Sequence, residues 1–323
     1  MKVFVTGGAG YIGSICVEEL LNAGHQVTVL DNLTEGHRGA VDPRAVFVAG
    51  DLADAALVTR ALRDAQAEAI MHFAANALVG ESMTNPAKYF RNNVASGLNL
   101  VQAAVETGVR KFVFSSTCAT FGMPERMPIT EDLPQKPVNP YGESKLMFEK
   151  ILQWFQAIHG LEFAAFRYFN AAGASRRFGE HHRIESHLIP NVLAVALGQK
   201  SECQIFGTDY PTPDGTCIRD YIHIIDLADA HIRALEPGRK GFYNLGNGSG
   251  YSVREVIQTC ARITGKNIPV VEKPRRPGDP PRLIAGSDKA RKELGWVTRF
   301  PKLEDIVASA WEWHKAHPHG YAD

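Results

Sequence analysis

Two side chains within residues 139–145 have the types and the spacing that proton transfer requires. Tyr141 and Lys145 are four residues apart, so on a helix they would share one face. Asn139 and Pro140 are typical of a helix N-cap and first helical position, which would place Tyr141 in the opening turn, at the positive end of the helix dipole. A free phenol titrates near ~10, and both the ammonium and the dipole would lower its pKa. The same spacing also arises by chance on a helix surface, so a tyrosine base needs support from the rest of the chain.

A glycine-rich segment near the start of the chain supplies the strongest local signal for a cofactor. Gly7, Gly10 and Gly13 stand between a predicted strand and a predicted helix, where a pyrophosphate can lie against backbone N–H groups. Their spacing is G-x-x-G-x-x-G. Asp31 ends the next predicted strand, where a carboxylate would bond the adenosine ribose and repel a 2′-phosphate. The sequence therefore predicts that the protein binds NAD rather than NADP.

The first half of the chain alternates short apolar runs with helical patterns. The runs predict strands and the longer patterns predict helices, at residues 3–5, 26–30, 46–48, 69–73, 111–114 and 163–166 for the strands and 56–65, 89–107 and 141–159 for the helices. Such alternation indicates βαβ units, and nearly continuous apolar strands indicate a sheet that is covered on both faces. We predict an α/β fold with a doubly wound, mostly parallel Rossmann-type sheet and a smaller α/β substrate-binding domain.

The alternation weakens after residue 170, which suggests a domain boundary. We assign residues 1–175 to the NAD-binding domain, with a return segment near 220–247, and residues 176–323 mainly to the second domain. An apolar helix is expected over 188–197. A turn-rich stretch at 209–220 is expected to form a surface loop.

Composition and charge limit the partners and the compartment. Lys plus Arg and Asp plus Glu both number 35, so neither a nucleic-acid partner nor a membrane-surface patch is indicated. Five widely spaced cysteines favour reduced thiols, and no signal peptide or membrane-spanning run is seen, so we expect a cytoplasmic protein. His181 and His182 could suggest a metal, but without a partner set at ligand spacing we expect loop residues and no metal.

Other strand ends offer further contacts, because ligands of a doubly wound sheet lie beyond the carboxyl ends of its strands. Asp51 could contact the cofactor or could cap the segment from Ala53 onward, and the sequence leaves both open. His72 lies in an apolar run and is expected to be a satisfied core histidine. Thr117 could bond both a substrate oxygen and the tyrosine, whereas Ser116 is expected to be a polar strand end without chemistry.

Taken together, these motifs are similar to those of the extended short-chain dehydrogenase/reductase superfamily and, within it, of the UDP-glucose 4-epimerase family. The resemblance covers nearly the whole chain. It rests on TGGAGYIG at 6–13, DNL at 31–33, HFAA at 72–75, VGES at 79–82, SST at 115–117, YGESK at 141–145, RYFN at 167–170, IFGTDY at 205–210 and RDYIH at 219–223.

The resemblance implies roles for individual residues. Tyr141 would take the proton of the sugar 4-hydroxyl, Thr117 would relay it, and Lys145 would bond the nicotinamide ribose and keep the phenolate charged. The cofactor-binding positions that it implies are Gly7, Gly10, Tyr11, Ile12, Gly13, Asp31, Asn32, Asp51, Leu52, Phe73, Ala74, Ala75, Asn92, Ser115, Tyr141, Lys145, Tyr168 and Phe169.

The same resemblance implies a UDP-sugar site in the second half. Arg219 and Arg276 would bind the diphosphate, and Asp279 would hold the uridine ribose, although Arg275, Arg276 and Arg282 could instead form a solvated basic turn. Asn170 and Leu188 would contact the diphosphate and uracil ends. The substrate-binding set is completed by Thr117, Tyr141, Gln204, Phe206, Tyr221 and Leu283.

The implied reaction is reversible inversion at C4 of a UDP-hexose, UDP-glucose or UDP-galactose, through a 4-keto intermediate. NAD would stay tightly bound and be regenerated in each cycle. Ala77 replaces a lysine of some relatives, which would loosen a nicotinamide contact, and Leu283 replaces a tyrosine that screens the sugar C2 substituent. We therefore expect that UDP-N-acetylhexosamines are also accepted.

Three alternative functions share the NAD-binding motifs. Cys118 and Ala119 occupy the positions where a 4,6-dehydratase carries its acid–base carboxyls, which argues against elimination. A UDP-pentose or UDP-uronate 4-epimerase stays open, as does a non-catalytic NAD-binding sensor. Residues 89–107 and 141–159 resemble helices that form a dimer interface in the family, so a homodimer is expected.

Overall fold

A seven-stranded, wholly parallel sheet forms the centre of the molecule. The computed structural model describes residues 1–276 and 278–322. The strands follow the order β10-β6-β5-β4-β1-β2-β3, and every neighbouring pair is parallel. Their bounds are β1 (Lys2–Thr6), β2 (Gln26–Asp31), β3 (Val46–Ala49), β4 (Ala69–His72), β5 (Lys111–Thr117), β6 (Glu162–Tyr168) and β10 (Gly241–Leu245).

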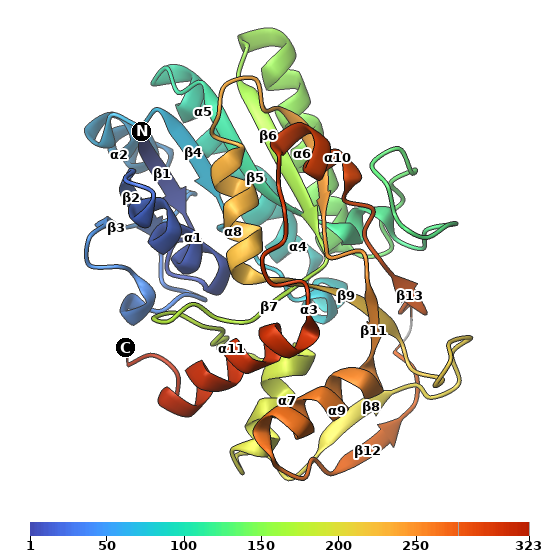
Figure 1. Ribbon diagram of the computed structural model, residues 1–323. Coiled ribbons are helices and arrows are strands. Elements are labelled where there is room, and N and C mark those ends of the chain that lie inside the picture. The colour runs from blue at the N-terminus through green and yellow to red at the C-terminus, as the bar shows by residue number, and fades with distance from the viewer. Residues whose placement is uncertain (277, 323) are drawn as a thin grey trace.

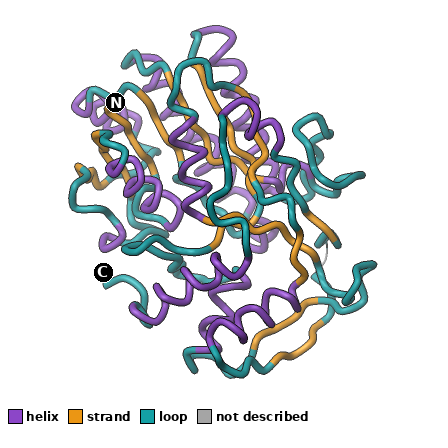
Figure 2. Tube along the Cα trace, viewed as in Figure 1, coloured by secondary structure: helices purple, strands orange, loops and turns teal. Residues whose placement is uncertain are grey.

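Helices cover both faces of this sheet, as Figures 1 and 2 show. On one face lie α1 (Tyr11–Asn22) and α8 (Ile224–Arg233), whose apolar side chains share a core with Val5 and Val29. On the other face lie α2 (Ala55–Ala65), α5 (Gly97–Glu106) and α6 (Pro140–His159), which pack with Phe4 and Ile70. Burial on both faces explains why the strands are continuously apolar. The predicted doubly wound α/β fold is confirmed.

The longest described helix, α6, carries the tyrosine and lysine. It begins as predicted: Pro140 is its first residue, and the Asn139 side chain accepts a hydrogen bond from the Gly142 N–H at 2.8 Å. It ends at Gly160, which adopts the left-handed conformation (φ +70°) that glycine tolerates best. None of the helices that the structure describes is both long enough and apolar enough to cross a membrane.

A smaller α/β layer lies below the carboxyl edge of the sheet (Figure 1). A four-stranded sheet has β9 at its centre, and a separate parallel pair, β8 with β12, lies further out. The strands of this layer are β7 (Asn170–Ala172), β8 (Cys203–Phe206), β9 (Ile218–His223), β11 (Gly250–Ser252), β12 (Val270–Lys273) and β13 (Arg282–Leu283). The helices in and around it are α7 (Leu188–Ala196), α9 (Val253–Thr264) and α11 (Leu303–Ala316), whereas α10 (Asp288–Leu294) packs against β10 and α8 of the main sheet.

Two sequence-based predictions about elements are wrong in part. The helix expected over 89–107 is interrupted, because a π-helical stretch (Phe90–Ser96) follows two short helices, α3 (Val79–Thr84) and α4 (Pro86–Tyr89), and only then continues as α5. The surface loop expected over 209–220 ends early, because residues 218–220 belong to β9. Asp220 there is completely buried, and it accepts hydrogen bonds from three backbone N–H groups.

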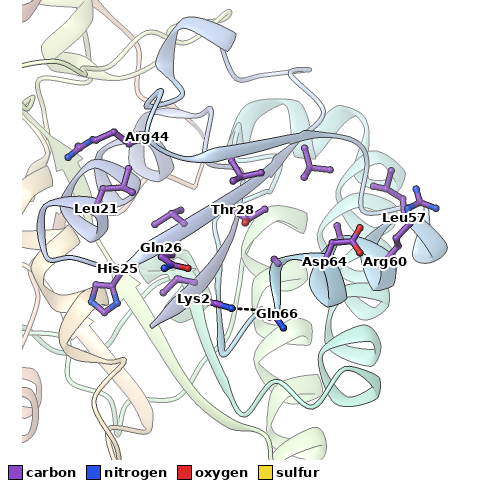
Figure 3. A pocket seen from close by; sticks show the side chains of 16 residues that line it. Lys2, Leu21, His25, Gln26, Thr28, Arg44, Leu57, Arg60, Asp64 and Gln66 are labelled. Carbon is purple, nitrogen blue, oxygen red and sulfur yellow. Dashed lines mark hydrogen bonds between the residues drawn. The ribbon is translucent and has the colours of Figure 1, made fainter.

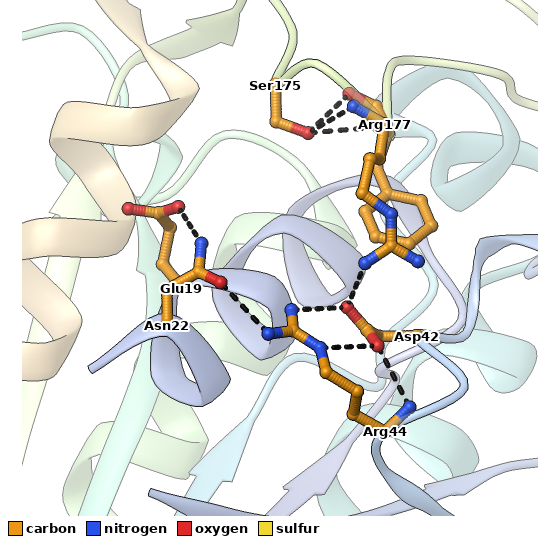
Figure 4. Close-up of polar contacts among 7 residues, drawn as sticks. Glu19, Asn22, Asp42, Arg44, Ser175 and Arg177 are labelled. Carbon is orange, nitrogen blue, oxygen red and sulfur yellow. Dashed lines mark hydrogen bonds and ion pairs between the residues drawn. The ribbon is translucent and has the colours of Figure 1, made fainter. Parts of the chain in front are cut away.

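The loop after β2 is joined to the segment after β7 by buried charge. Asp42 is fully buried and accepts hydrogen bonds from Arg44 and, at 2.6 Å, from Arg177 (Figure 4). Burial raises the pKa of Asp42, but its contacts with Arg44 and Arg177 outweigh burial and lower it. These contacts thus hold the loop between β2 and β3 against the segment after β7.

Candidate active site

The glycine loop between β1 and α1 leaves no room for a Cβ at Gly7 or Gly13. A Cβ on Gly7, whose φ is +74°, would lie 2.4 Å from the Ala74 nitrogen, and a Cβ on Gly13 would lie 2.1 Å from the Gly7 oxygen. The loop therefore lies directly against the end of β4 and exposes backbone at the start of α1. This is the close backbone approach that a pyrophosphate requires, so the residues present fit NAD.

Asp31 stabilises the glycine loop and lies at the strand end where the ribose is predicted to bind. Its two carboxylate oxygens accept hydrogen bonds from the N–H groups of Ala9 (3.0 Å) and Leu33 (2.8 Å). Burial raises the pKa of Asp31, and these two hydrogen bonds oppose the rise. A carboxylate can accept about four hydrogen bonds in total, so Asp31 retains capacity for ribose hydroxyls.

Asp51 makes the contact with the segment from Ala53 that was one of its two alternatives, and its contact with the cofactor stays a prediction. One oxygen accepts the Ala53 N–H at 2.8 Å, and the other accepts the Asn32 side-chain amide at 2.7 Å. The N-cap of α2 itself is Asp54, which accepts the Leu57 N–H. Asp51 therefore orders the loop and also positions Asn32 at the predicted cofactor edge.

The remaining predicted cofactor positions follow the carboxyl ends of successive strands. The N–H groups of Phe73 and Ala74 donate to the Thr6 oxygen at 2.9 and 3.1 Å, and Leu52 is buried beside Phe4. The others in these loops are Gly10, Tyr11 and Ile12 after β1, and Ala75 after β4. Tyr11 is buried and donates through its hydroxyl to the Gly173 oxygen at 2.6 Å.

His72 and Ser116 have structural partners, as expected. His72 is buried, and its Nδ1 lies 2.7 Å from the Thr6 hydroxyl. Burial, reinforced by Lys145, lowers the pKa of His72 to about 3, so the ring is neutral. Ser116 donates to Glu149 at 2.6 Å, inside a buried network that includes Arg167. Neither side chain is available for a substrate.

Tyr141 and Lys145 are brought to the end of β5, but their electrostatics differ from the prediction. Lys145 donates to the Ser115 carbonyl oxygen at 2.8 Å, and burial lowers its pKa to about 7. Burial raises the pKa of Tyr141 to about 12, although hydrogen bonding with Thr117 opposes the rise. The expected depression of the phenol pKa is therefore wrong for the chain alone. A positive nicotinamide ring nearby would shift it in the required direction.

Polar side chains around Tyr141 and Lys145 are hydrogen-bonded to one another in two sets. The hydroxyls of Ser115 and Tyr168 are hydrogen-bonded to each other. The Asn92 side-chain amide donates a hydrogen bond to the Asn93 side-chain oxygen. The buried Asn93 side chain also accepts from the backbone N–H of Asn76, and it donates to the backbone oxygen of Asn76 and, at 3.0 Å, to the Ser144 hydroxyl. Asn93 was missed in the sequence. The available signal was a second amide beside Asn92 in an otherwise helical pattern.

Strand β9 gathers the predicted substrate residues. Asn170 pairs with Tyr221 across β7 and β9, and Leu283 pairs with Arg219 across β13 and β9. Arg219 forms an ion pair with Asp279. Four substrate positions from three distant segments thus lie on adjacent strands.

The other basic residues have partners of their own. The Arg276 guanidinium lies 3.9 Å from the centre of the Phe206 ring, on β8, a strand that also carries the exposed Gln204. Arg275 forms a 2.6 Å ion pair with Asp209. These contacts order two of the three arginines, whereas Arg282 is exposed on β13. Leu188 begins α7.

The side chains predicted for catalysis and those predicted for substrate binding lie close together around Cys118. This residue follows Thr117 and lies within electrostatic range of Arg219 and Asp220; burial raises its pKa to about 12, so it remains a thiol. Leu283 packs in the same apolar cluster as Phe169 and Cys118. The predicted C2 contact is therefore next to the predicted proton relay.

A hollow elsewhere in the molecule is unrelated to these residues. It has a volume of about 560 Å³ and is lined by residues such as Lys2, Gln26 and Thr28 (Figure 3). None of its lining residues belongs to the predicted site. Because Lys2 and Gln26 begin β1 and β2, the hollow reaches the amino ends of strands, opposite to where ligands of such sheets bind.

The expectation that the adjacent histidines lack partners at ligand spacing is wrong for His182. Four side chains of one loop offer ligand atoms that all lie within 4.8 Å of one another. We call them the His–Glu cluster: Glu180, His182, Glu185 and His187.

The fold and the site together define a class of NAD-dependent enzyme acting on nucleotide sugars. The sequence matches the model of the NAD dependent epimerase/dehydratase family over residues 3–246. The chain belongs to this family.

Individual similar proteins indicate one particular enzyme within this family. The chain is 52% identical to UDP-glucose 4-epimerase of Halalkalibacterium halodurans, covering 100% of this chain and 98% of that one. A crystal structure of a UDP-glucose 4-epimerase superimposes with a TM-score of 0.97 at 47% identity, covering 99% of both chains. The Bifidobacterium longum enzyme, in complex with NAD+ and UDP, superimposes with a TM-score of 0.94 at 39% identity, also covering 99% of both.

Proposed function

We propose that this protein is a UDP-glucose 4-epimerase, which interconverts UDP-glucose and UDP-galactose with NAD. The observation that carries the proposal is the joint placement of Tyr141, Thr117 and Lys145 at the end of β5, in the same sheet as a glycine loop that has no room for a Cβ at Gly7 or Gly13. The full-length similarity to UDP-glucose 4-epimerases supports the choice of reaction. We further propose the division into residues 1–175 with a return near 220–247, and 176–323.

Each polar group at the end of β5 then has a task. NAD, held by the glycine loop and Asp31, would supply reversible hydride transfer at C4 of the sugar. Tyr141 accepts the 4-hydroxyl proton through Thr117 and returns it later. Lys145, held by the Ser115 carbonyl oxygen, contributes a buried positive charge and bonds the cofactor ribose. Because the Ser115 carbonyl oxygen and the Thr117 hydroxyl hold Lys145 and Tyr141 in place, little reorganisation is needed during the reaction.

The smaller layer holds the nucleotide. Arg219 and Arg276 bind the diphosphate, and Asp279 exchanges its ion pair with Arg219 for the uridine ribose. Asn170, Leu188 and Tyr221 complete the binding surface. This arrangement anchors UDP while leaving the hexose free to present either face of C4.

The test of the proposal uses the purified protein with its own cofactor. UDP-galactose, UDP-N-acetylgalactosamine and UDP-arabinose are supplied separately, and C4 inversion is followed by nuclear magnetic resonance. NAD is released by denaturing a second sample and is quantified. We expect about one NAD per chain and conversion of UDP-galactose to UDP-glucose. No bound NAD and no inversion would contradict the proposal, while inversion of UDP-arabinose alone would assign the pentose reaction.

Leu283 determines the tolerance at C2. Leucine in this position, packed near Cys118, leaves more room than tyrosine, so UDP-N-acetylhexosamines are also substrates. Leu283→Tyr should lower kcat/KM for UDP-N-acetylgalactosamine by at least about tenfold, the discrimination typical of a steric change in a pocket, and largely spare UDP-galactose. Wild-type enzyme that converts UDP-galactose but not the N-acetylated sugar would refute this part.

The protein acts as a homodimer in the cytoplasm. Apolar side chains on α5 and α6 are exposed in the single chain: Leu98, Met147, Trp154 and Ile158. Such a patch is typical of an interface. Trp154→Glu should shift the mass measured by light scattering from dimer to monomer, whereas Val297→Glu, at an equally exposed apolar position elsewhere, should not. All five cysteines are free, which fits a reducing compartment.

A further inference from the structure

The ion pairs within the His–Glu cluster leave two of its buried polar atoms without a hydrogen bond. Glu180 Oε1 lies 3.2 Å from His182 Nε2 and 3.0 Å from His187 Nδ1. The Glu180 side chain is only 5% exposed, yet this oxygen and His182 Nε2 make no hydrogen bond of acceptable geometry. Three atoms therefore lie close together, but two of them lack the alignment that hydrogen bonds require, and the third, His187 Nδ1, is hydrogen-bonded with Glu185 Oε1 at 2.9 Å.

The two carboxylates of the cluster also favour a bound cation. Two carboxylates, one of them buried, lie in a group whose ligand atoms are within 4.8 Å of one another. Two negative charges at such a separation repel unless positive charge lies between them. Two imidazole nitrogens and two carboxylate oxygens suit zinc, which prefers four ligands of these types, whereas Mg²⁺ and Ca²⁺ prefer oxygen ligands.

We propose that the His–Glu cluster binds one Zn²⁺ ion. His187 Nδ1 and Glu185 Oε1 lie 2.9 Å apart, and the His182 and His187 rings have centroids 4.9 Å apart, so modest side-chain rotation brings all four groups onto one ion. The His187 side chain is 51% exposed, which gives the ion a path of entry.

The position of the cluster makes its role structural. His182 meets the Tyr11 ring edge-on at 6.1 Å, next to the glycine loop, and His187 directly precedes α7. Between them, Arg183 donates to the Gly36 oxygen at 3.1 Å. A bound ion would fix the loop that joins the cofactor end of the sheet to the helix carrying Leu188.

The experiment measures metal binding directly. The untagged protein with its NAD is treated with a chelator, freed of it, and titrated with Zn²⁺ and separately with Mg²⁺ by calorimetry. We expect one Zn²⁺ per chain, no comparable heat with Mg²⁺, and a higher thermal midpoint after zinc addition. His182→Gln and His187→Gln should each weaken Zn²⁺ binding by at least about tenfold, the loss seen even for groups one step removed from a metal.

Two controls make the result decisive. His319→Gln alters an exposed histidine outside the cluster and should bind Zn²⁺ like the wild type. NAD content verifies that each variant is folded, and Glu185→Gln, at a partly exposed side chain, replaces any variant that is not. The absence of stoichiometric Zn²⁺ uptake would overturn the proposal. It would also be overturned if His182→Gln and His187→Gln bound Zn²⁺ as tightly as the wild type. Either result would leave the cluster as a set of ion pairs only.

Discussion

At the scale of single residues, the group proposed as the base is a phenol whose environment opposes that role. Burial raises the pKa of Tyr141 to about 12, and burial lowers that of Lys145 to about 7. Sequence spacing correctly placed both groups on one helix. It could not reveal the cost of burial, because that cost depends on what packs around the end of β5. The positive charge that compensates must therefore come largely from the bound cofactor.

The first prediction follows from this assignment. Tyr141→Phe removes the proton acceptor but keeps the ring that packs beside Tyr89, so NAD content should be unchanged. The turnover number should fall by roughly 10²–10⁴, the usual contribution of a positioned acid or base. The measurement is kcat for UDP-galactose, with NAD quantified in parallel. Activity within tenfold of the wild type would exclude Tyr141 as the base.

At the scale of elements, the fit of the loop between β1 and α1 decides cofactor binding. Gly13→Ala would place a methyl group 2.1 Å from the Gly7 oxygen, so the loop would have to move. We expect loss of most bound NAD, measured after denaturation. Gly80→Ala adds the same methyl group where nothing lies within 4 Å, and should retain NAD. Equal NAD content in the two variants would contradict the proposed cradle.

The second element-scale prediction concerns the attachment of α6 to the sheet. Glu149 is buried and bonds Ser116 on β5 and Arg167 on β6, at 2.6 and 2.7 Å for the shortest contacts. Glu149→Gln leaves a buried arginine unpaired, which typically costs about 3–5 kcal/mol. Urea unfolding should show a loss of this size.

A surface ion pair provides the matched control for Glu149. Glu304→Gln breaks the exposed pair with Arg262 and should change the free energy of unfolding by less than about 1 kcal/mol. If both variants lost similar stability, the buried network would not be what holds α6.

Elements were more predictable than their interruptions. Apolar runs and glycine stops located the strands and helices of the sheet, because a doubly covered parallel sheet leaves a strong local pattern. The π-helical stretch and the strand position of Asp220 depend on contacts with distant residues. Local sequence carries no signal for them. The partners of His182 were missed for the same reason: they alternate along a loop without helical or strand periodicity.

At the scale of the whole molecule, buried neutral histidines make the fold sensitive to acid. Burial lowers the pKa of His72 to about 3 and those of His223 and His231 to about 4. Below about pH 6.5 the unfolded chain takes up protons at these positions while the folded chain does not. The free energy of unfolding should therefore fall as pH decreases from about 6.5 toward 4.

A single substitution tests this sign. His231 donates one hydrogen bond through Nδ1, to the Leu227 carbonyl oxygen, and packs on Phe166. His231→Phe removes one titrating group, so the pH dependence of the unfolding free energy should decrease by about 1.4 kcal/mol per pH unit over this range. Chemical unfolding at pH 7, 6 and 5 measures it. An unchanged slope would show that His231 is not buried in its neutral form.

The most direct test of the whole account follows one atom. UDP-galactose carrying deuterium at C4 is incubated with the purified protein in ordinary water, without added cofactor, and the UDP-glucose formed is examined by nuclear magnetic resonance. If the hydride leaves C4 and returns to it inside the closed site, the product keeps the deuterium at C4 with inverted configuration. UDP-glucose with hydrogen from solvent at C4, or no UDP-glucose at all, would contradict the account.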